Sequence, residues 1–347
     1  AHYRRFTYPL LFASLGLLVA VLVVGKQAGG AVRWFRLGPL SFQPSELAKF
    51  ALALYLASLL ARKAEKVREF SIGFLPPMVV AGAMMALLLK QPDLGTALIF
   101  GVVSLAMLFV AGTRTSYLIL AVLAAAPVGW HFIVGTEWRM RRVLAFLNPE
   151  AYRKDVAYQT WQSLVAIGSG GAWGRGLGAS RQKLEFLPEA HTDFILAVVG
   201  EELGLLGVLA VTAGFLVIVW RGLLAAARAR DVFGSYLAFG ITSTLALQAF
   251  FNMAVAMSLL PAKGLPLPFI SYGGTSLVVS LFSAGVLANI SARNPEPRPG
   301  PFWLGFGHRR ARGHNRRADD APRIIVEVGP PPRPRKAPPI EELGGAS

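Results

Sequence analysis

The sequence predicts an all-α, polytopic membrane protein with eight spanning helices. Hydrophobic residues make up 54% of the chain and charged residues 16%, and the mean hydropathy is +0.50. Soluble domains carry about one quarter charged residues, whereas a spanning helix needs about 20 mostly apolar residues. Several runs of that kind occur along the chain. Cysteine is absent, which excludes a disulfide framework and a thiolate metal site.

The apolar runs set the expected topology and domains. The eight predicted spans are 8–25, 47–61, 72–89, 94–112, 116–134, 194–220, 232–260 and 275–290. We expect kinks at Pro76, Pro77 and Pro127, which neighbouring helices can tolerate. Between the fifth and sixth spans, the interval 135–192 contains amphipathic pieces and is typical of a functional loop. The membrane domain is therefore 1–290, and the Pro- and Arg-rich segment 291–347 is predicted to be a disordered basic tail.

Basic residues indicate the orientation of the spans. The net charge is +16, which on a soluble protein would suggest nucleic-acid binding. In a membrane protein, basic residues on alternate short connections mark the cytoplasmic side. Connections on one side of the predicted membrane carry Arg62, Lys63, Lys66, Arg68, Arg114, Arg228 and Arg230. We therefore expect this side and the tail to be cytoplasmic, 135–192 to lie outside, and no nucleic-acid partner.

The first polar cluster on the expected outer side comes before and within the second span. It contains Arg33, Trp34, Glu46 and Lys49. Polar residues at the membrane edge are functional candidates because burying them costs free energy. Glu46 and Lys49 are three residues apart and share one helical face. The alternative is structural, with an interfacial tryptophan, a capping Ser45 and a simple ion pair.

Two further clusters are short connections between spans. Residues 90–93 form a tight turn in which Asp93 is suited to cap the next helix, and we favour that structural interpretation. Residues 261–276 contain several prolines and glycines together with Ser271. Irregular backbone at this depth must be covered by protein or line a cavity. This turn is either part of the site or a rigid connector.

The most informative cluster precedes the sixth span. Lys183, Glu189, His191 and Asp193 come just before the apolar run, and Glu201 follows within it. An aspartate at the mouth of a helix can be a cap. The density of ionisable groups at the membrane edge favours a functional site centred on Asp193.

These motifs together resemble the SEDS family, which includes FtsW, RodA and SpoVE. The matching motifs, in order, are Arg33-Trp34, the QPSELAK stretch 43–49, the QPDLGT stretch 91–96, the PEAHTDF stretch 188–194 with GEE at 200–202, and the PLPFISYGG stretch 266–274. They extend over nearly all of 3–290. Members of this family have ten spans, so the resemblance implies that the first two are missing here. The basic stretch 139–142, the KGLP stretch 263–266 and the long basic tail are more similar to the FtsW branch.

The resemblance implies a peptidoglycan glycosyltransferase in the bacterial cytoplasmic membrane, with its active site facing outside. The substrate is lipid II, whose sugars are joined into a β-1,4 glycan while an undecaprenyl pyrophosphate leaves. Asp193 corresponds to the family's essential aspartate, and a divalent cation, Mg²⁺ or Mn²⁺, is suspected to bind there. The candidate substrate-binding residues are Arg33, Trp34, Glu46, Lys49, Arg139, Arg142, Lys183, Glu189, His191 and Ser271. The implied partners are a class B penicillin-binding protein and other divisome or elongasome proteins.

Two other functions remain open at the level of sequence. A lipid II flippase would need polar groups through the whole membrane, whereas a polymerase needs its acid at the outer face. The charged motifs cluster outside and favour the polymerase. A non-enzymatic division scaffold would suit the tail but would leave the outer motifs without a role.

Overall fold

The computed structural model describes residues 2–28, 31–37 and 40–293. In this part of the chain, eight helices are long and apolar enough to cross a membrane, which confirms the predicted fold class. They are α1 (Thr7–Val24), α2 (Pro44–Arg62), α3 (Leu75–Lys90), α4 (Leu94–Ala111), α5 (Thr115–Val134), α9 (Ile195–Arg228), α10 (Val232–Ala256) and α11 (Gly274–Ala292). The third span also includes the helical residues that precede α3 and begins at Phe70. The predicted tail begins at 291, within α11, and its residues 294–347 lie outside the described residues.

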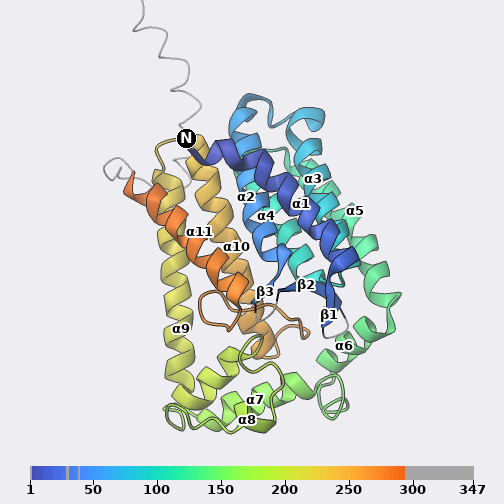
Figure 1. Ribbon diagram of the computed structural model, residues 1–347, viewed down its shortest axis with the longest axis vertical. Coiled ribbons are helices and arrows are strands. Elements are labelled where there is room, and N and C mark those ends of the chain that lie inside the picture. Colours follow the sequence, from blue (N-terminus) through green and yellow to red (C-terminus); the bar gives the residue numbers. More distant parts are fainter. Residues whose placement is uncertain (1, 29–30, 38–39, 294–347) are drawn as a thin grey trace, which may run out of the picture. The chain divides into compact units, whose positions relative to one another are not determined.

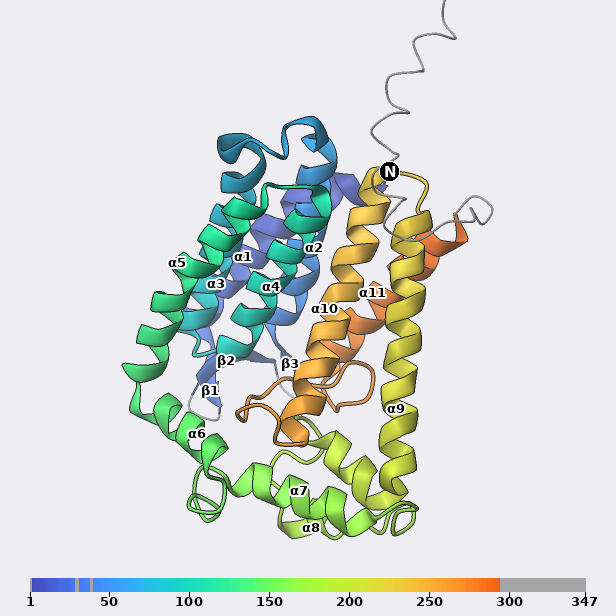
Figure 2. The same ribbon diagram turned by 180° about the vertical axis from the view of Figure 1, so that it is seen from behind.

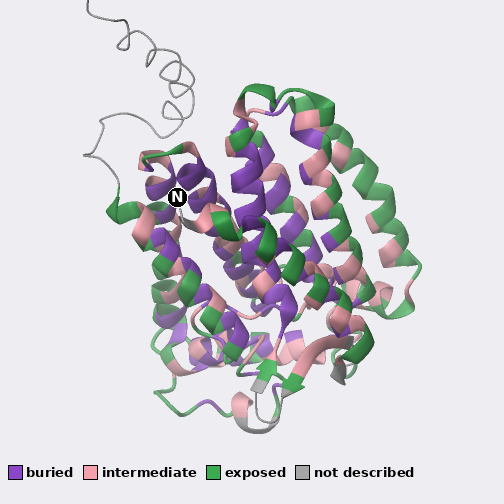
Figure 3. Ribbon diagram, turned by 45° about the horizontal axis from the view of Figure 1, so that its top comes forward, coloured by how far each residue is buried: buried purple, intermediate pink, exposed green. Residues whose placement is uncertain are grey.

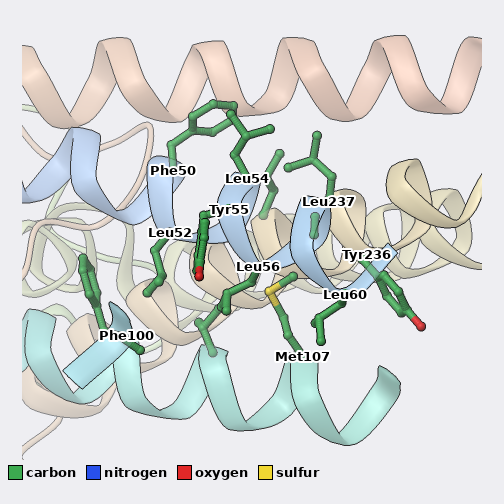
Figure 4. Close-up of a cluster of buried hydrophobic side chains, with 14 of the residues drawn as sticks. Phe50, Leu52, Leu54, Tyr55, Leu56, Leu60, Phe100, Met107, Tyr236 and Leu237 are labelled. Atoms are coloured by element: carbon green, nitrogen blue, oxygen red, sulfur yellow. The ribbon is translucent and has the colours of Figure 1, made fainter. Parts of the chain in front are cut away.

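Helix α2 is the centre of the bundle. Within it, 83% of the spanning window is buried inside the protein, compared with 6% for α5. Figure 4 shows Leu52, Leu56 and Leu60 of α2 among side chains of α4 and α10, including Met107 and Leu237. Helix α5 instead exposes most of its side chains at the edge of the bundle (Figure 3). The bundle therefore has a protein-lined centre around α2 and a lipid-facing periphery.

One end of the bundle carries a second layer of structure. The interval 135–192 folds into α6 (Glu137–Leu147), α7 (Tyr158–Gly170) and α8 (Gln182–Glu185). Between α1 and α2, β1 (Lys26–Ala28), β2 (Ala31–Leu37) and β3 (Leu40–Phe42) form an antiparallel sheet in the order β1-β2-β3. These elements lie at the end opposite to the N-terminus (Figures 1 and 2). The sequence pattern did not predict the sheet, because its strands are short.

Helix α9 differs from the predicted sixth span. It has 34 residues and continues to Arg228, and at 1.5 Å per residue it would be about 50 Å long if straight. That exceeds the hydrocarbon core of about 30 Å. Gly204 interrupts it with φ 66° and ψ −161°, a backbone conformation open mainly to glycine. The stretch before Gly204 joins the second layer, since the carbonyls of Glu201 and Glu202 accept hydrogen bonds from the amides of Arg175 and Gly176, both at 3.0 Å.

The prolines at which kinks were expected lie in two of the spanning helices. Pro76 and Pro77 fall in the first turn of α3, and a spanning segment that runs from Phe70 to Lys90 continues through them. The kink expected at these prolines stays a prediction. A short π-helical stretch, Phe70–Phe74, precedes them. Pro127 does lie inside α5.

Candidate active site

The candidate site lies at the end of the bundle that carries the sheet and α6 to α8 (Figure 2). The segment that contains Asp193 folds tightly just before α9. Glu189 has a left-handed backbone, φ 55°, which costs of order 1–3 kcal/mol for a residue with a side chain. Its carbonyl accepts hydrogen bonds from the amides of Thr192 at 3.2 Å and Asp193 at 3.1 Å. This turn places Asp193 outside the helix that follows it.

The turn between α10 and α11 holds this segment in place. Ser271 Oγ donates to Thr192 O at 2.5 Å, and Tyr272 N donates to His191 O at 2.8 Å. Asn252 Nδ2 of α10 donates to Asp193 O at 2.8 Å. The Ser271 hydroxyl also accepts a hydrogen bond from Leu267 N at 2.7 Å. Ser271 was predicted to bind substrate, but both of these hydrogen bonds join its side chain to backbone atoms. Its observed contacts position Asp193.

The carboxyl group of Asp193 lies in an environment that favours its neutral form. Burial, followed by the nearby carboxylate of Glu189, raises the pKa of Asp193 from 3.8 to about 7. The guanidinium groups of Arg33 and Arg142 oppose this shift, and Asp93 adds to it. The structure therefore brings three of the predicted residues, Glu189, Arg33 and Arg142, within electrostatic range of Asp193. A carboxyl group with a pKa near neutrality is suited to general-base chemistry.

The two arginines are held by backbone carbonyls. Arg33 Nε donates to Gln91 O at 3.0 Å, and its Nη2 donates to Pro92 O. Arg142 Nη1 donates to Ala262 O at 3.1 Å. Burial and the charge of Arg33 lower the pKa of Arg142, and Asp193 partly offsets this. Guanidinium groups stay charged in proteins, so the site holds two fixed cations beside one carboxyl group.

Lys263 is a third cation that the sequence did not assign to the site. It is half-buried beside Gly264, and burial lowers its pKa while the Asp93 carboxylate opposes the change. Its ammonium group lies 6.0 Å from the ring centre of Phe251. Gly264 lies close to Asp193 in the folded chain, and no pattern in the sequence signals that proximity.

Asp93 has the structural role that was favoured for it. Its Oδ1 accepts a hydrogen bond from Thr96 N at 3.1 Å and caps α4, so the capping prediction is confirmed. Gln91 in the same turn donates from Nε2 to Leu18 O at 2.9 Å. The turn that holds Arg33 is therefore fixed to both α1 and α4.

Glu46 and Lys49 form the predicted ion pair inside the bundle. Lys49 Nζ lies 2.8 Å from Glu46 Oε1 and donates to Gln248 Oε1 at 2.6 Å. Both charged residues are buried and border a small cavity of about 20 Å³. The predicted capping by Ser45 was wrong, because Pro44 begins the helix after Gln43 and the Ser45 hydroxyl is buried without a partner.

The other predicted residues lie apart from this group of charges. Arg139 Nη1 donates to Phe132 O at 2.9 Å, and its guanidinium lies over the Trp138 ring. Lys183 Nζ pairs with Glu202 Oε1 at 2.5 Å. Trp34 is half-buried in β2, and His191 is exposed. The side chains of these four residues face the second layer or solvent. The backbone carbonyl of His191 accepts a hydrogen bond from Tyr272 N.

A divalent cation was expected at Asp193. Among the residues that the structure describes, no group of three or more His, Cys, Asp or Glu side chains could hold a metal ion. Mg²⁺ is, however, commonly bound by one or two carboxylates together with substrate phosphates. Asp193 and Glu189 interact electrostatically, and their carboxylates are donors of the type that such a site uses.

The match to known proteins extends over most of the chain. A family model described as cell cycle protein, FtsW/RodA/SpoVE, matches residues 1–296. The chain belongs to the FtsW/RodA/SpoVE family. A family member from Geobacter sulfurreducens, named a probable peptidoglycan glycosyltransferase FtsW, is 50% identical over 293 residues, 84% of this chain and 79% of that protein. Another with the same name, from Idiomarina loihiensis, is 45% identical over 81% of this chain and 69% of its own length.

Solved structures of the FtsW/RodA/SpoVE family share the fold. One describes how a peptidoglycan synthase complex coordinates polymerization and crosslinking, and its matching chain is 32% identical with a TM-score of 0.72. The match covers 85% of this chain and 83% of that one. The rod shape determining protein RodA of Thermus thermophilus is 30% identical, with a TM-score of 0.61 over 85% of this chain and 80% of that protein.

Proposed function

We propose that this chain is a peptidoglycan glycosyltransferase that polymerises lipid II into β-1,4 glycan strands. The names and folds of its relatives support the reaction class. The observation that carries the proposal for this chain is the position of Asp193. Its half-buried carboxyl group has a pKa of about 7 and lies in the field of Arg33 and Arg142.

The proposed step is a direct displacement at the sugar. Asp193 accepts the proton of the acceptor's 4-hydroxyl while that oxygen attacks the anomeric carbon of the donor. The bond from this carbon to the pyrophosphate oxygen breaks, and undecaprenyl pyrophosphate leaves with the bonding electrons. General bases of this kind contribute about 10²–10⁴-fold to rate. The proton then passes from Asp193 to solvent, which restores the carboxylate.

The cations would act on the leaving group. Arg33 and Arg142 are held by backbone carbonyls beside the site, so they can face a diphosphate without rearranging during the reaction. Lys263 adds a third positive charge nearby. Fixed positive charge aimed at developing negative charge stabilises a transition state. A bound Mg²⁺ or Mn²⁺, held by Asp193 and Glu189, would neutralise further charge on the pyrophosphate.

The chain is a multi-pass membrane protein, and we propose the bacterial cytoplasmic membrane with the Asp193 end facing outside. The opposite end carries the short connections of the bundle, α2 to α3, α4 to α5 and α9 to α10 (Figure 1). Those connections hold the basic cluster at 62–68, Arg114 and Arg230. Short basic connections favour the cytoplasmic side.

We also propose a class B penicillin-binding protein as partner, which would cross-link the new glycan. One similar solved structure is of a complex that coordinates polymerization and crosslinking. Helix α3 exposes Gly82 and Ala86, four residues apart on one face. Small residues on a lipid-facing surface allow another helix to approach closely.

Purified protein in liposomes, supplied with lipid II, tests the proposal. We expect glycan polymer, and more of it when the class B partner from the same cell is present. Movement of lipid II across the bilayer without any polymer would favour a flippase. Neither polymer nor movement, with every partner from that cell, would contradict both functions.

A further inference from the structure

Two amide side chains of α10 connect the buried ion pair to the candidate active site. Gln248 and Asn252 are four residues apart and lie on one face of the helix. Gln248 accepts a hydrogen bond from Lys49 and donates from Nε2 to Pro266 O at 2.9 Å. Asn252 donates from Nδ2 to Leu265 O at 2.7 Å and to Asp193 O at 2.8 Å. Both amides therefore hold neighbouring carbonyls of the same turn.

The orientation of the Asn252 amide follows from its neighbours. Both nearby atoms are carbonyl oxygens, which only accept hydrogen bonds, so the NH₂ group must face them. The side chain is 1% exposed, and its Oδ1 is buried with no hydrogen-bond partner. Leaving such an acceptor unpaired is unfavourable. The Asn252 side chain nevertheless adopts this orientation, in which it links Asp193 directly to Leu265.

We propose that Asn252 is a positioning residue for glycosyl transfer and that Gln248 supports it from the next turn of the helix. This inference rests on the proposed function. Asn252 joins the backbone of Asp193 to the turn that carries Lys263 and Gly264. Gln248 attaches the same turn to Lys49, which is paired with Glu46. The buried ion pair is thus connected to the site through these amides.

The expected effect follows from what each bond fixes. Without the Asn252 amide, the Asp193 segment and the 265–266 turn can move apart by a fraction of their contact distance. A displacement of about 1 Å in a catalytic group can lower the rate about 10²-fold. Arg33 is held by Gln91 and Pro92, whereas the Asn252 amide bonds to Asp193 and Leu265. Binding of lipid II should therefore change little while turnover falls.

The test compares Asn252→Ala with Ser235→Ala in lipid II polymerisation by the full chain. Ser235 is the matched control, because its hydroxyl also donates a buried hydrogen bond from α10 to a carbonyl, Ala226 O at 2.6 Å. We expect Asn252→Ala to lower kcat by about 10²-fold with KM changed less than about threefold. Ser235→Ala should keep the wild-type kcat, and Gln248→Ala should lower kcat less than Asn252→Ala does.

Each outcome bears on the proposal. A wild-type kcat for Asn252→Ala overturns it, as does a loss that appears only in KM or that Ser235→Ala reproduces. If Asn252→Ala does not fold, Asn252→Ser replaces it, because serine keeps one hydrogen-bond donor. We expect a reduced kcat at unchanged KM for Asn252→Ser, and a wild-type kcat for this variant would overturn the proposal. An inactive wild-type protein would instead contradict the proposed function.

Discussion

A Cβ atom on Gly264 would lie 2.8 Å from Oδ2 of Asp193. At such a short distance the atoms overlap, so one of the two groups must move. The Asp193 carboxyl group is the nearest group to this Cβ position, and it can move by rotating its side chain. We predict that Gly264→Ala folds but lowers kcat for lipid II polymerisation about tenfold or more, since it displaces the base. Gly285→Ala is the control, because no atom lies within 4 Å of its Cβ position. Equal activity of the two variants would show that Asp193 tolerates displacement.

The pH dependence of the reaction should follow Asp193. The carboxylate must be ionised to accept a proton, so activity should rise with pH through about 7. Glu189→Gln removes a negative charge that raises the pKa of Asp193, and the midpoint should move to lower pH. Arg142→Gln removes a positive charge that lowers this pKa, and the midpoint should move to higher pH. Shifts of both variants in the same direction, in pH–rate profiles of kcat/KM, would contradict the assignment.

Most of the fold could be predicted from sequence, because each spanning helix corresponds to one continuous segment of the chain. Each is a run of apolar residues as long as the bilayer is thick, and a charge such as Arg62 or Arg114 marks where a run ends. The break at Gly204 could not be predicted in this way. It depends on backbone hydrogen bonds from Leu205 and Leu206 to Gly171 and Ala172, which are distant in sequence.

The site was predictable only in part. Asp193, Arg33 and Glu189 were found because unpaired charge at a membrane edge is rare, whereas Arg142 was named only through the resemblance to the family. Lys263 was missed, because what brings it to the site is the fold of the turn around Gly264. The side-chain roles of Ser271 and Lys183 also depend on partners distant in sequence, Thr192 and Glu202, which a pattern of residue types does not specify.

Glu201 should be structural. Its carboxylate is fully buried and accepts hydrogen bonds from Ser180 Oγ at 2.6 Å and from the amides of Arg181 at 3.2 Å and Gln182 at 3.3 Å. We predict that Glu201→Ala lowers the free energy of unfolding by on the order of 3 kcal/mol, since it leaves these donors unpaired. Thermal unfolding in detergent and proteolysis near Arg175 measure this. Exposed Glu150→Ala should change neither, and a stable Glu201→Ala protein would show that the second layer is held by other contacts.

The orientation can be read with single cysteines, because the chain has none of its own. Glu65 and Ala151 are exposed. Glu65 belongs to the connection between α2 and α3 and Ala151 to the connection between α6 and α7, and these connections lie at opposite ends of the bundle (Figure 1). We predict that an impermeant thiol reagent applied to intact cells labels Ala151→Cys, and labels Glu65→Cys only after the membrane is opened. Labelling of both cysteines from one side would contradict the topology.

The most direct test of the account is lipid II polymerisation by Asp193→Asn. Asparagine has nearly the same size, and the backbone carbonyl of residue 193 can still accept the hydrogen bond from Asn252. We predict that the variant folds with a free energy of unfolding within about 1 kcal/mol of the wild type. It should make no glycan, because the group that accepts the hydroxyl proton is gone. Near-normal polymerisation by the folded Asp193→Asn protein would contradict the central claim that Asp193 is the catalytic base.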